Sequence, residues 1–276
     1  MLKNLSKRTI VILLSLMMAI EVIPFSMYGI EGMTSHADEV TDPKIECAHG
    51  NHGERDANGI CTVCGDYNGE RIEDWQEWTT SNALPTSGHY YLGTDVNVSA
   101  LTTTTGELYL DLNGYTISAT SSTTTYVYSL SYNCNVYDTS ENKEGTITDY
   151  KCCFYMAAGK ELNIFGGNFV ENQVFKDKEK STKKGGVVYV NNNSTLNVFD
   201  GKFQNNADLY AGVFYIYRNG CLKIYGGQFL ENKNYMKGHT QGACYGGGVI
   251  GIGGSSSSYK PSVDIMGGVL MAMKHM

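Results

Sequence analysis

The stretch that decides the fold is LNIFGGNFVEN at residues 162–172, because two closely similar segments follow it in the sequence. The copies are LNVFDGKFQNN at 196–206 and LKIYGGQFLEN at 222–232, and the alignment extends backwards without gaps over 152–172, 186–206 and 212–232. A fourth, split copy has GVIGIG from Gly248 and DIMGGVL from Asp264. Repeats of this length predict a solenoid, since one copy cannot bury its own apolar face and must stack on the next.

Apolar residues recur at three sets of positions in these copies. Alternate residues of a strand point to the same side, so each set predicts one short strand with an inward face. Three inward faces per copy predict coils of triangular cross-section. The sets are Phe154/Met156, Val188/Val190, Phe214/Ile216 and Ile250/Ile252; then Leu162/Ile164, Leu196/Val198 and Leu222/Ile224; and then Phe169, Phe203 and Phe229.

Three other columns are predicted to lie at the coil surface or corners. Tyr155, Tyr189 and Tyr215 have the parity opposite to the inward residues, so they predict an outward aromatic stack. Such a stack is either a platform for sugar rings or a set of cross-strand pairs that steadies the sheet. The other two columns are interpreted as structural: a ladder at a corner with left-handed backbone, and packing beside a glycine corner. They comprise Asn172, Asn206 and Asn232, and Phe165, Phe199 and Tyr225.

The first 37 residues predict a secretory signal peptide. Lys3, Lys7 and Arg8 precede an apolar run, and Ser35-His36-Ala37 resembles a cleavage site. Glu21 interrupts the run, which leaves it shorter than the roughly 20 residues of a membrane span. The sequence therefore predicts a secreted or cell-surface protein with no stable membrane span after cleavage.

The charge balance argues against two classes of partner. Removing residues 1–37 takes away three positive and two negative charges, so the net charge of −7 becomes −8. An acidic chain without a Lys/Arg block excludes nucleic acid and anionic membrane surfaces as expected partners. The composition, with 32 Gly, 20 Tyr and only 4 Pro, is typical of short strands joined by tight turns.

A small Cys/His module is predicted at residues 38–70. Cys47, His49, Cys61 and Cys64 supply the four N/S ligands that a structural zinc ion requires, and His52 is an alternative ligand. A disulfide and a reactive cysteine remain alternative interpretations. The stretch DANGICTVCG at 56–65 resembles the second half of short C-x-H…G-x-C-x-x-C-G modules in exported proteins of Gram-positive bacteria. Those modules carry no settled function over to this chain.

The repeat region resembles right-handed parallel β-helices of the pectin-lyase-like type over residues 75–270. LYLDLNGYTI at 108–117 is similar to their early coils and the GG-x-F-x-x-N pattern to their later ones. The resemblance implies an all-β, single-stranded, right-handed parallel β-helix behind the small module. An antiparallel β-sandwich is the alternative.

The domain boundaries follow from this interpretation. Residues 71–100 are expected to form an N-terminal cap and first coil, plugged by Trp75 and Trp78, and residues 101–276 the β-helix repeats. The repeats are expected to be truncated at the C-terminus, as in a piece of a longer protein. The cysteines outside the module are predicted to pack as small apolar residues: Cys134, Cys152, Cys153, Cys221 and Cys244.

Related enzymes of this fold carry NTD, Asp-Asp, GHG and RIK motifs, and this sequence has none of them. Its Asp111, Asp138, Asp200 and Asp264 fall on different columns, and Arg218 is the sole arginine after Arg71. No catalytic residue is therefore assigned. The expected role is non-catalytic, adhesin-like binding of a glycan or host surface, with the outward tyrosines as ligand contacts. A polysaccharide lyase or glycoside hydrolase and a passive stalk are the alternatives.

Overall fold

The computed structural model describes residues 75–120, 126–173, 185–208, 210–234, 247–254 and 257–271. All of them belong to one compact unit, Pro43–Met276. The regular elements in these ranges are all β-strands, and every ladder between them is parallel. The predicted signal peptide and Cys/His module lie outside the described residues.

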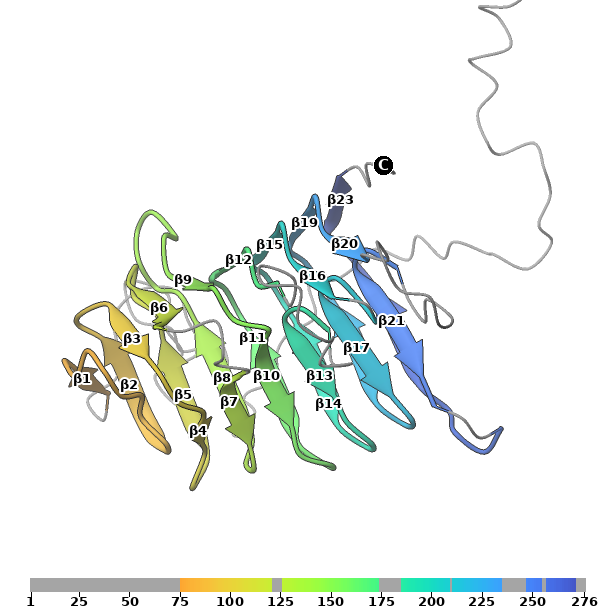
Figure 1. The fold of residues 1–276 in the computed structure, drawn as a ribbon, viewed down its shortest axis with the longest axis horizontal. Helices are drawn as coiled ribbons and strands as arrows, with labels where there is room; N and C mark the ends of the chain where they lie inside the picture. Colours follow the sequence, from red (N-terminus) through yellow and green to blue (C-terminus); the bar gives the residue numbers. More distant parts are fainter. Residues whose placement is uncertain are drawn as a thin grey trace, which may run out of the picture. The chain divides into compact units, whose positions relative to one another are not determined.

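Three stacked sheets make up the fold (Figure 1). The eight-stranded sheet comprises, in spatial order, β1 (Gln76–Trp78), β2 (Gly88–Leu92), β5 (Leu108–Asp111), β8 (Cys134–Tyr137), β11 (Glu161–Ile164), β14 (Thr195–Val198), β18 (Cys221–Ile224) and β22 (Ser262–Ile265). The seven-stranded sheet comprises β3 (Val96–Val98), β6 (Thr116–Ala119), β9 (Thr146–Thr148), β12 (Asn168–Val170), β15 (Lys202–Gln204), β19 (Gln228–Leu230) and β23 (Val269–Met271).

The third sheet has six strands: β4 (Thr102–Thr103), β7 (Tyr126–Leu130), β10 (Cys152–Met156), β13 (Val188–Val190), β17 (Phe214–Tyr217) and β21 (Ile250–Gly253). A short pair, β16 (Ala207–Asp208) and β20 (Lys233–Asn234), lies apart from them. From β2 onwards the chain visits the eight-, seven- and six-stranded sheets in turn, and each return places a strand beside its predecessor. The predicted parallel solenoid is therefore confirmed, and the antiparallel alternative is wrong for the described strands.

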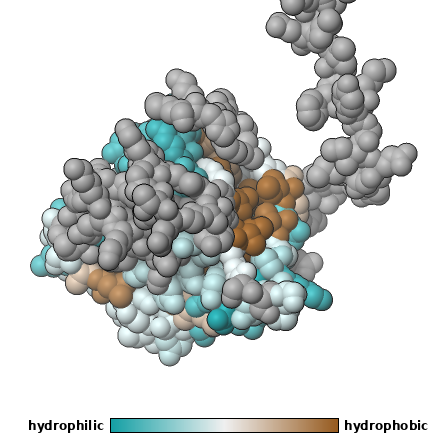
Figure 2. Space-filling model, turned by 45° about the vertical axis from the view of Figure 1, so that its right-hand side comes forward, coloured by the Kyte–Doolittle hydropathy of each residue, from teal (hydrophilic) through white to brown (hydrophobic). Residues whose placement is uncertain are grey.

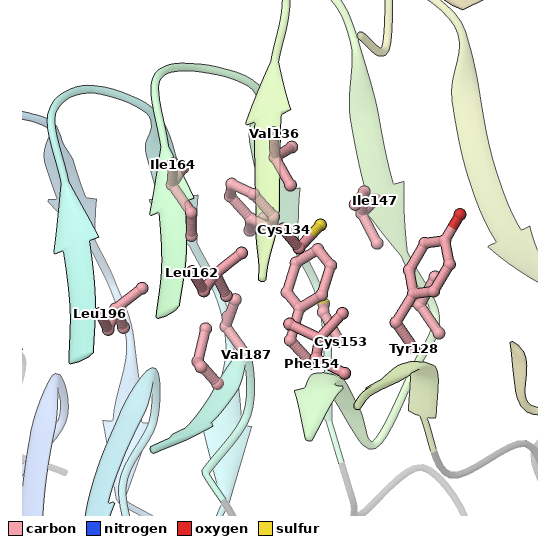
Figure 3. Close-up of a cluster of buried hydrophobic side chains, with 14 of the residues drawn as sticks. Tyr128, Cys134, Val136, Ile147, Cys153, Phe154, Leu162, Ile164, Val187 and Leu196 are labelled. Carbon is pink, nitrogen blue, oxygen red and sulfur yellow. The ribbon is translucent and has the colours of Figure 1, made fainter. Parts of the chain in front are cut away.

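The register matches the sequence repeat residue for residue. Leu162 pairs with Leu196 and Leu196 with Leu222, so identical columns lie on top of one another. The inward columns fill one continuous core, into which side chains from successive coils point (Figure 3). Phe169, Phe203 and Phe229 stack inside it with ring centroids 4.9 Å apart. Every coil except the last described one buries its predicted inward residues.

The asparagine column forms a buried ladder at one corner. Asn172 donates its backbone N–H and its side-chain amide to Oδ1 of Asn206, at 3.0 and 3.1 Å. Asn206 donates in the same way to Asn232, at 3.0 Å each. The sequence predicted left-handed backbone at the ladder asparagines, but the structure has it one residue earlier, at Glu171, Asn205 and Glu231, with φ of 56°, 55° and 52°. Asp149, which precedes Tyr150 at the same corner one coil earlier, has φ 68°. At this corner, therefore, one residue makes the turn and the next residue makes the ladder hydrogen bonds.

The end of the solenoid at β1 is closed by a plug. Leu84 is 4% exposed, and Trp78 packs against the core while its Nε1 donates to the carbonyl of Ala83 at 2.8 Å. Tyr128 holds the same segment by donating its hydroxyl to the carbonyl of Pro85 at 3.0 Å. Trp75 does not plug the coil as predicted. It lies against rings of the outer face, with centroids 5.6 Å from His89 and 5.7 Å from Tyr137.

Three of the predicted packing cysteines are buried and form no disulfide, namely Cys134, Cys152 and Cys153. Burial raises the pKa of the Cys134 and Cys153 thiols, which keeps them protonated. Cys221 is free and half-buried, and Cys244 lies outside the described residues. The described cysteines therefore behave as packing groups.

Candidate functional site

The predicted tyrosine column lies on the outside of the six-stranded sheet. Tyr155 pairs with Tyr189 across β10 and β13, and Tyr189 with Tyr215 across β13 and β17. The ring centroids of the first pair are 5.1 Å apart and nearly parallel, and those of the second are 5.8 Å apart and tilted by 36°. The column belongs to a hydrophobic cluster distinct from the core. This outer tyrosine cluster comprises Cys152, Tyr189, Ala211 and Tyr215, with Tyr126, Tyr155, Tyr210 and Tyr217 at its margin.

The cluster has a buried centre and a half-buried margin. Tyr189 and Tyr215 expose only 8% and 6% of their surfaces, so they offer no open ring face for a sugar. The margin tyrosines are the accessible part. Three of these, Tyr126, Tyr210 and Tyr217, were not identified from the sequence. They lie off the repeated column, because Tyr126 contacts Tyr155 diagonally and Tyr210 comes from the loop before β17.

Burial changes the acid–base properties of the cluster. It raises the pKa of the Tyr126 and Tyr189 hydroxyls, and neighbouring groups such as Cys152 and Tyr155 raise it further. The hydroxyls are therefore neutral at physiological pH. A neutral phenol can both donate and accept a hydrogen bond, so the margin can bind polar groups without carrying charge.

Arg218 lies at the edge of the cluster, directly after β17. Its guanidinium carbon is 4.9 Å from the Tyr217 ring centroid and 5.1 Å from that of Tyr259, both within the range of a cation–π contact. A side-chain hydrogen bond with Tyr217 raises the pKa of Arg218. Its Nε is covered and has no hydrogen-bond partner in the structure as described. Arg218 is also the single arginine of the described ranges, so the only guanidinium there is held at the tyrosine-rich face.

The tyrosine column stops at β21, where glycines replace the aromatic residues. Gly251 pairs with Tyr215, and Gly253 pairs with Tyr217. A Cβ on Gly253 would collide with the hydroxyl of Tyr215, and one on Gly251 would collide with the carbonyl oxygen of Tyr210. The glycines of β21 therefore leave room for the ring of Tyr215, which extends from β17 over the last described coil.

A second aromatic column lies outside the eight-stranded sheet. Tyr137, Phe165, Phe199 and Tyr225 form a ladder with successive centroids 4.8 Å apart and ring planes within 7° of parallel. Both faces of each inner ring are therefore covered by the next ring. Beside this ladder, Asn163 donates to Asn135 at 3.0 Å and Asn197 donates to Asn163 at 2.8 Å. The interpretation of Phe165, Phe199 and Tyr225 as packing residues agrees with this geometry.

The buried carboxylates of Asp111 and Asp138 accept hydrogen bonds from backbone amides. Asp111 accepts hydrogen bonds from the amides of Asn113 and Thr139 at 2.8 and 2.9 Å. Asp138 accepts from Gly114 at 3.0 Å and from Gly145 at 2.8 Å. The two side chains meet at one corner although they are offset by one residue in the register. Both are almost fully buried, so they tie turns together and neither is placed to attack or protonate a bound substrate.

Within the part of the chain that the structure describes, no three His, Cys, Asp or Glu side chains gather closely enough to hold a metal ion. The predicted zinc ligands Cys47, His49, His52, Cys61 and Cys64 lie outside that part. The same ranges contain no helix with the length and apolarity that crossing a membrane requires. No protein-family model, curated protein or solved structure matches the chain.

Proposed function

We propose that the chain is an exported, non-catalytic binding protein that contacts a glycan or another host-surface component through its outer tyrosine cluster. The observation that carries this proposal is the half-buried margin of tyrosines that ends at Arg218. Tyrosine and arginine are the residue types most enriched where proteins bind their partners, because each joins a large apolar surface to hydrogen-bonding groups.

The geometry restricts how a ligand would lie on this face. Tyr155 and Tyr189 cover each other's ring faces, so the contacts would be made by ring edges and hydroxyls rather than by stacked faces. Arg218 and Tyr217 would supply donors at one end of the row. A ligand with several hydroxyl groups, such as a saccharide, suits a surface that offers neutral phenols and one cation.

A passive stalk is the second candidate, and the ring ladder outside the eight-stranded sheet favours it. The rings of Tyr137, Phe165, Phe199 and Tyr225 are already fully engaged with one another. If the tyrosine cluster serves the same purpose, the solenoid is a spacer and its outer columns only stiffen it.

The finer details of the fold belong to the same proposal. We infer a right-handed solenoid of the pectin-lyase-like type, supported by the cyclic order of the sheets and by the strong preference of parallel crossovers for the right hand. Residues 1–37 would direct export. Residues 38–70 would bind a structural zinc ion through Cys47, His49, Cys61 and Cys64, with His52 as an alternative ligand. Quantifying zinc in the purified protein, with and without a chelator, tests the last point.

The binding proposal is tested by screening the full chain on a glycan array and in a polysaccharide-degradation assay. Binding without release of reducing or unsaturated sugar is the expected result, and such release would overturn the non-catalytic assignment. Tyr217→Ala and Arg218→Gln should weaken binding by about tenfold or more, as the loss of an interface anchor does. Tyr132→Ala is the matched control, because Tyr132 is an exposed tyrosine outside the cluster. Equal binding by all three variants would place the binding site outside the tyrosine cluster, and no glycan bound at all would favour the stalk.

A further inference from the structure

The outer face of the eight-stranded sheet changes in character along the stacking direction. In its first coils one outward row holds two rings, His89 on β2 and Tyr109 on β5, which stack with centroids 4.2 Å apart. The same row continues as Asn135, Asn163 and Asn197, which are hydrogen-bonded to one another. In the view of Figure 2, the described surface is largely polar, and apolar surface is confined to a few patches. Outward aromatic residues in this row are therefore a feature of the coils nearest β1.

Trp75 lies across this part of the face. Its ring contacts His89 on β2 and Tyr137 on β8, two strands that have β5 between them. Its Nε1 is covered and has no hydrogen-bond partner in the structure as described. An indole N–H can only donate, and buried donors in proteins are nearly always paired. The entry patch, defined as Trp75, His89, Tyr109 and Tyr137, therefore contains a buried donor that lacks an acceptor.

The chain enters the solenoid at the entry patch. Trp75 is the first described residue, and residues 43–74 of the same compact unit precede it. This leading segment carries seven acidic and three basic residues, so carboxylates as well as backbone carbonyls are available in it as acceptors. A segment that is joined directly to the patch needs only weak contacts to dock there, because the covalent link makes the encounter intramolecular.

We propose that the leading segment, residues 43–74, docks on the entry patch, with one of its oxygen atoms accepting the hydrogen bond of Trp75 Nε1. The segment then covers the outward rings of His89 and Tyr109, and the amide ladder of the later coils stays outside the contact. The N-terminal part of the compact unit is thereby held against the side of the first coils. This proposal rests neither on glycan binding nor on the predicted zinc ion.

Photo-crosslinking in the full chain tests the docking directly. Tyr109 is replaced by the photoreactive residue p-benzoylphenylalanine, and the peptides that are joined on irradiation are identified by mass spectrometry. The expected crosslink is intramolecular and confined to one short stretch within residues 43–74. The same replacement at Tyr225 is the matched control, because Tyr225 is half-buried on the same face and follows β18, four strands beyond β5. The control should give no crosslink to the leading segment.

The rate of tryptic cleavage after Arg55 and Arg71 gives a second measure of docking. His89→Ala and Tyr109→Ala should each raise this rate about tenfold, because cleavage follows the population of the undocked state. Tyr225→Ala should leave the rate unchanged. Circular dichroism should show the folded spectrum in all three variants, since each replaced side chain lies outside the core.

Three crosslinking results would overturn the proposal: a crosslink to a second copy of the chain, crosslinks spread over the whole leading segment, or none at all. The first would assign the entry patch to an interface between copies, and the second would describe a segment that is tethered but not docked. Cleavage that is equally fast in the wild type and in the two entry-patch variants would contradict it as well.

Discussion

The two ends of the solenoid are built from the same kinds of residue but differ in burial. At the β1 end, Leu84 and Trp78 cover the first coil, and the core beneath them is closed. At the β22 end, Ile252 and Ile265 pair with the buried Ile216 and Ile224 of the preceding coil, yet about half of each side chain is exposed. The comparison teaches that in this fold a residue's environment depends on the coil that follows it, and only secondarily on its own type.

The largest expected effect contrasts two isoleucines of one column. Ile164→Ala removes a side chain with a coil on either side and should lower the free energy of unfolding by about 3 kcal/mol. Ile265→Ala in the open coil should cost less than about 1 kcal/mol, since much of its surface already meets water. Urea denaturation of both variants provides the measurement. Equal losses would break the comparison.

The asparagine ladder allows a second contrast, between an inner rung and the last rung. Asn206→Ala deprives Asn172 of its acceptor, Phe169 of its donor and Asn232 of a side-chain donor, which should cost about 3 kcal/mol. Asn232→Ala, at the last rung, removes fewer bonds and should cost about 2 kcal/mol. The difference between the midpoints of the two variants in denaturant is the quantity of interest, with wild type as the reference.

Removing the plug at the β1 end should expose its core, as the core is exposed at the β22 end. Leu84→Ala removes a nearly buried plug residue and should lower the free energy of unfolding by about 2 kcal/mol, at the low end for a large-to-small change. Binding of a hydrophobic dye should increase in the folded state. Leu101→Ala, at an exposed position in the same part of the chain, should change neither property. A plug that can be removed without loss would mean that the first coil is closed by something else.

The smallest effect concerns pH. Burial raises the pKa of the hydroxyls of Tyr126, Tyr150 and Tyr189 above the ordinary value near 10. A group whose pKa is raised by folding contributes stability that is complete below its unfolded pKa and is lost as the pH rises towards its folded pKa. The melting temperature should therefore stay level up to about pH 9 and fall above about pH 10. Absorbance titration of tyrosinate should show these groups ionising together with unfolding, and a normal titration in the folded chain would contradict the prediction.

Much of the fold could be read from the repeat, since the closely similar sequences that begin at Leu162, Leu196 and Leu222 predict the same inward columns. The inward residues and the outward position of the tyrosine column followed from strand parity, whereas the burial of the asparagine column is evident only in the structure. The position of Trp75 did not follow, because nothing local distinguishes a tryptophan that plugs a coil from one that lies against His89 and Tyr137. The left-handed residues Glu171, Asn205 and Glu231 lie one position before the ladder asparagines, a shift that the residue types of the repeat do not reveal.

The candidate site was less predictable than the fold. Parity placed Tyr155, Tyr189 and Tyr215 outside the sheet, but it could not reveal that two of them are nearly buried. That depends on Tyr126, Tyr210 and Tyr217, which come from non-repeated positions and meet the column only in space. The contact of Arg218 with Tyr259 is likewise set by a loop outside the repeat.

The sequence by itself determined that the coils stack and which side of each strand faces inward. A period-two apolar pattern that repeats in register can bury all its apolar residues in only one way, with the same face of every strand turned to the core. Tertiary structure alone decided which tyrosines are accessible, which tryptophan closes the first coil and which of the described inward residues are exposed. The reason is physical: strand direction is a local property of the backbone, whereas exposure depends on neighbours that lie far away in the chain.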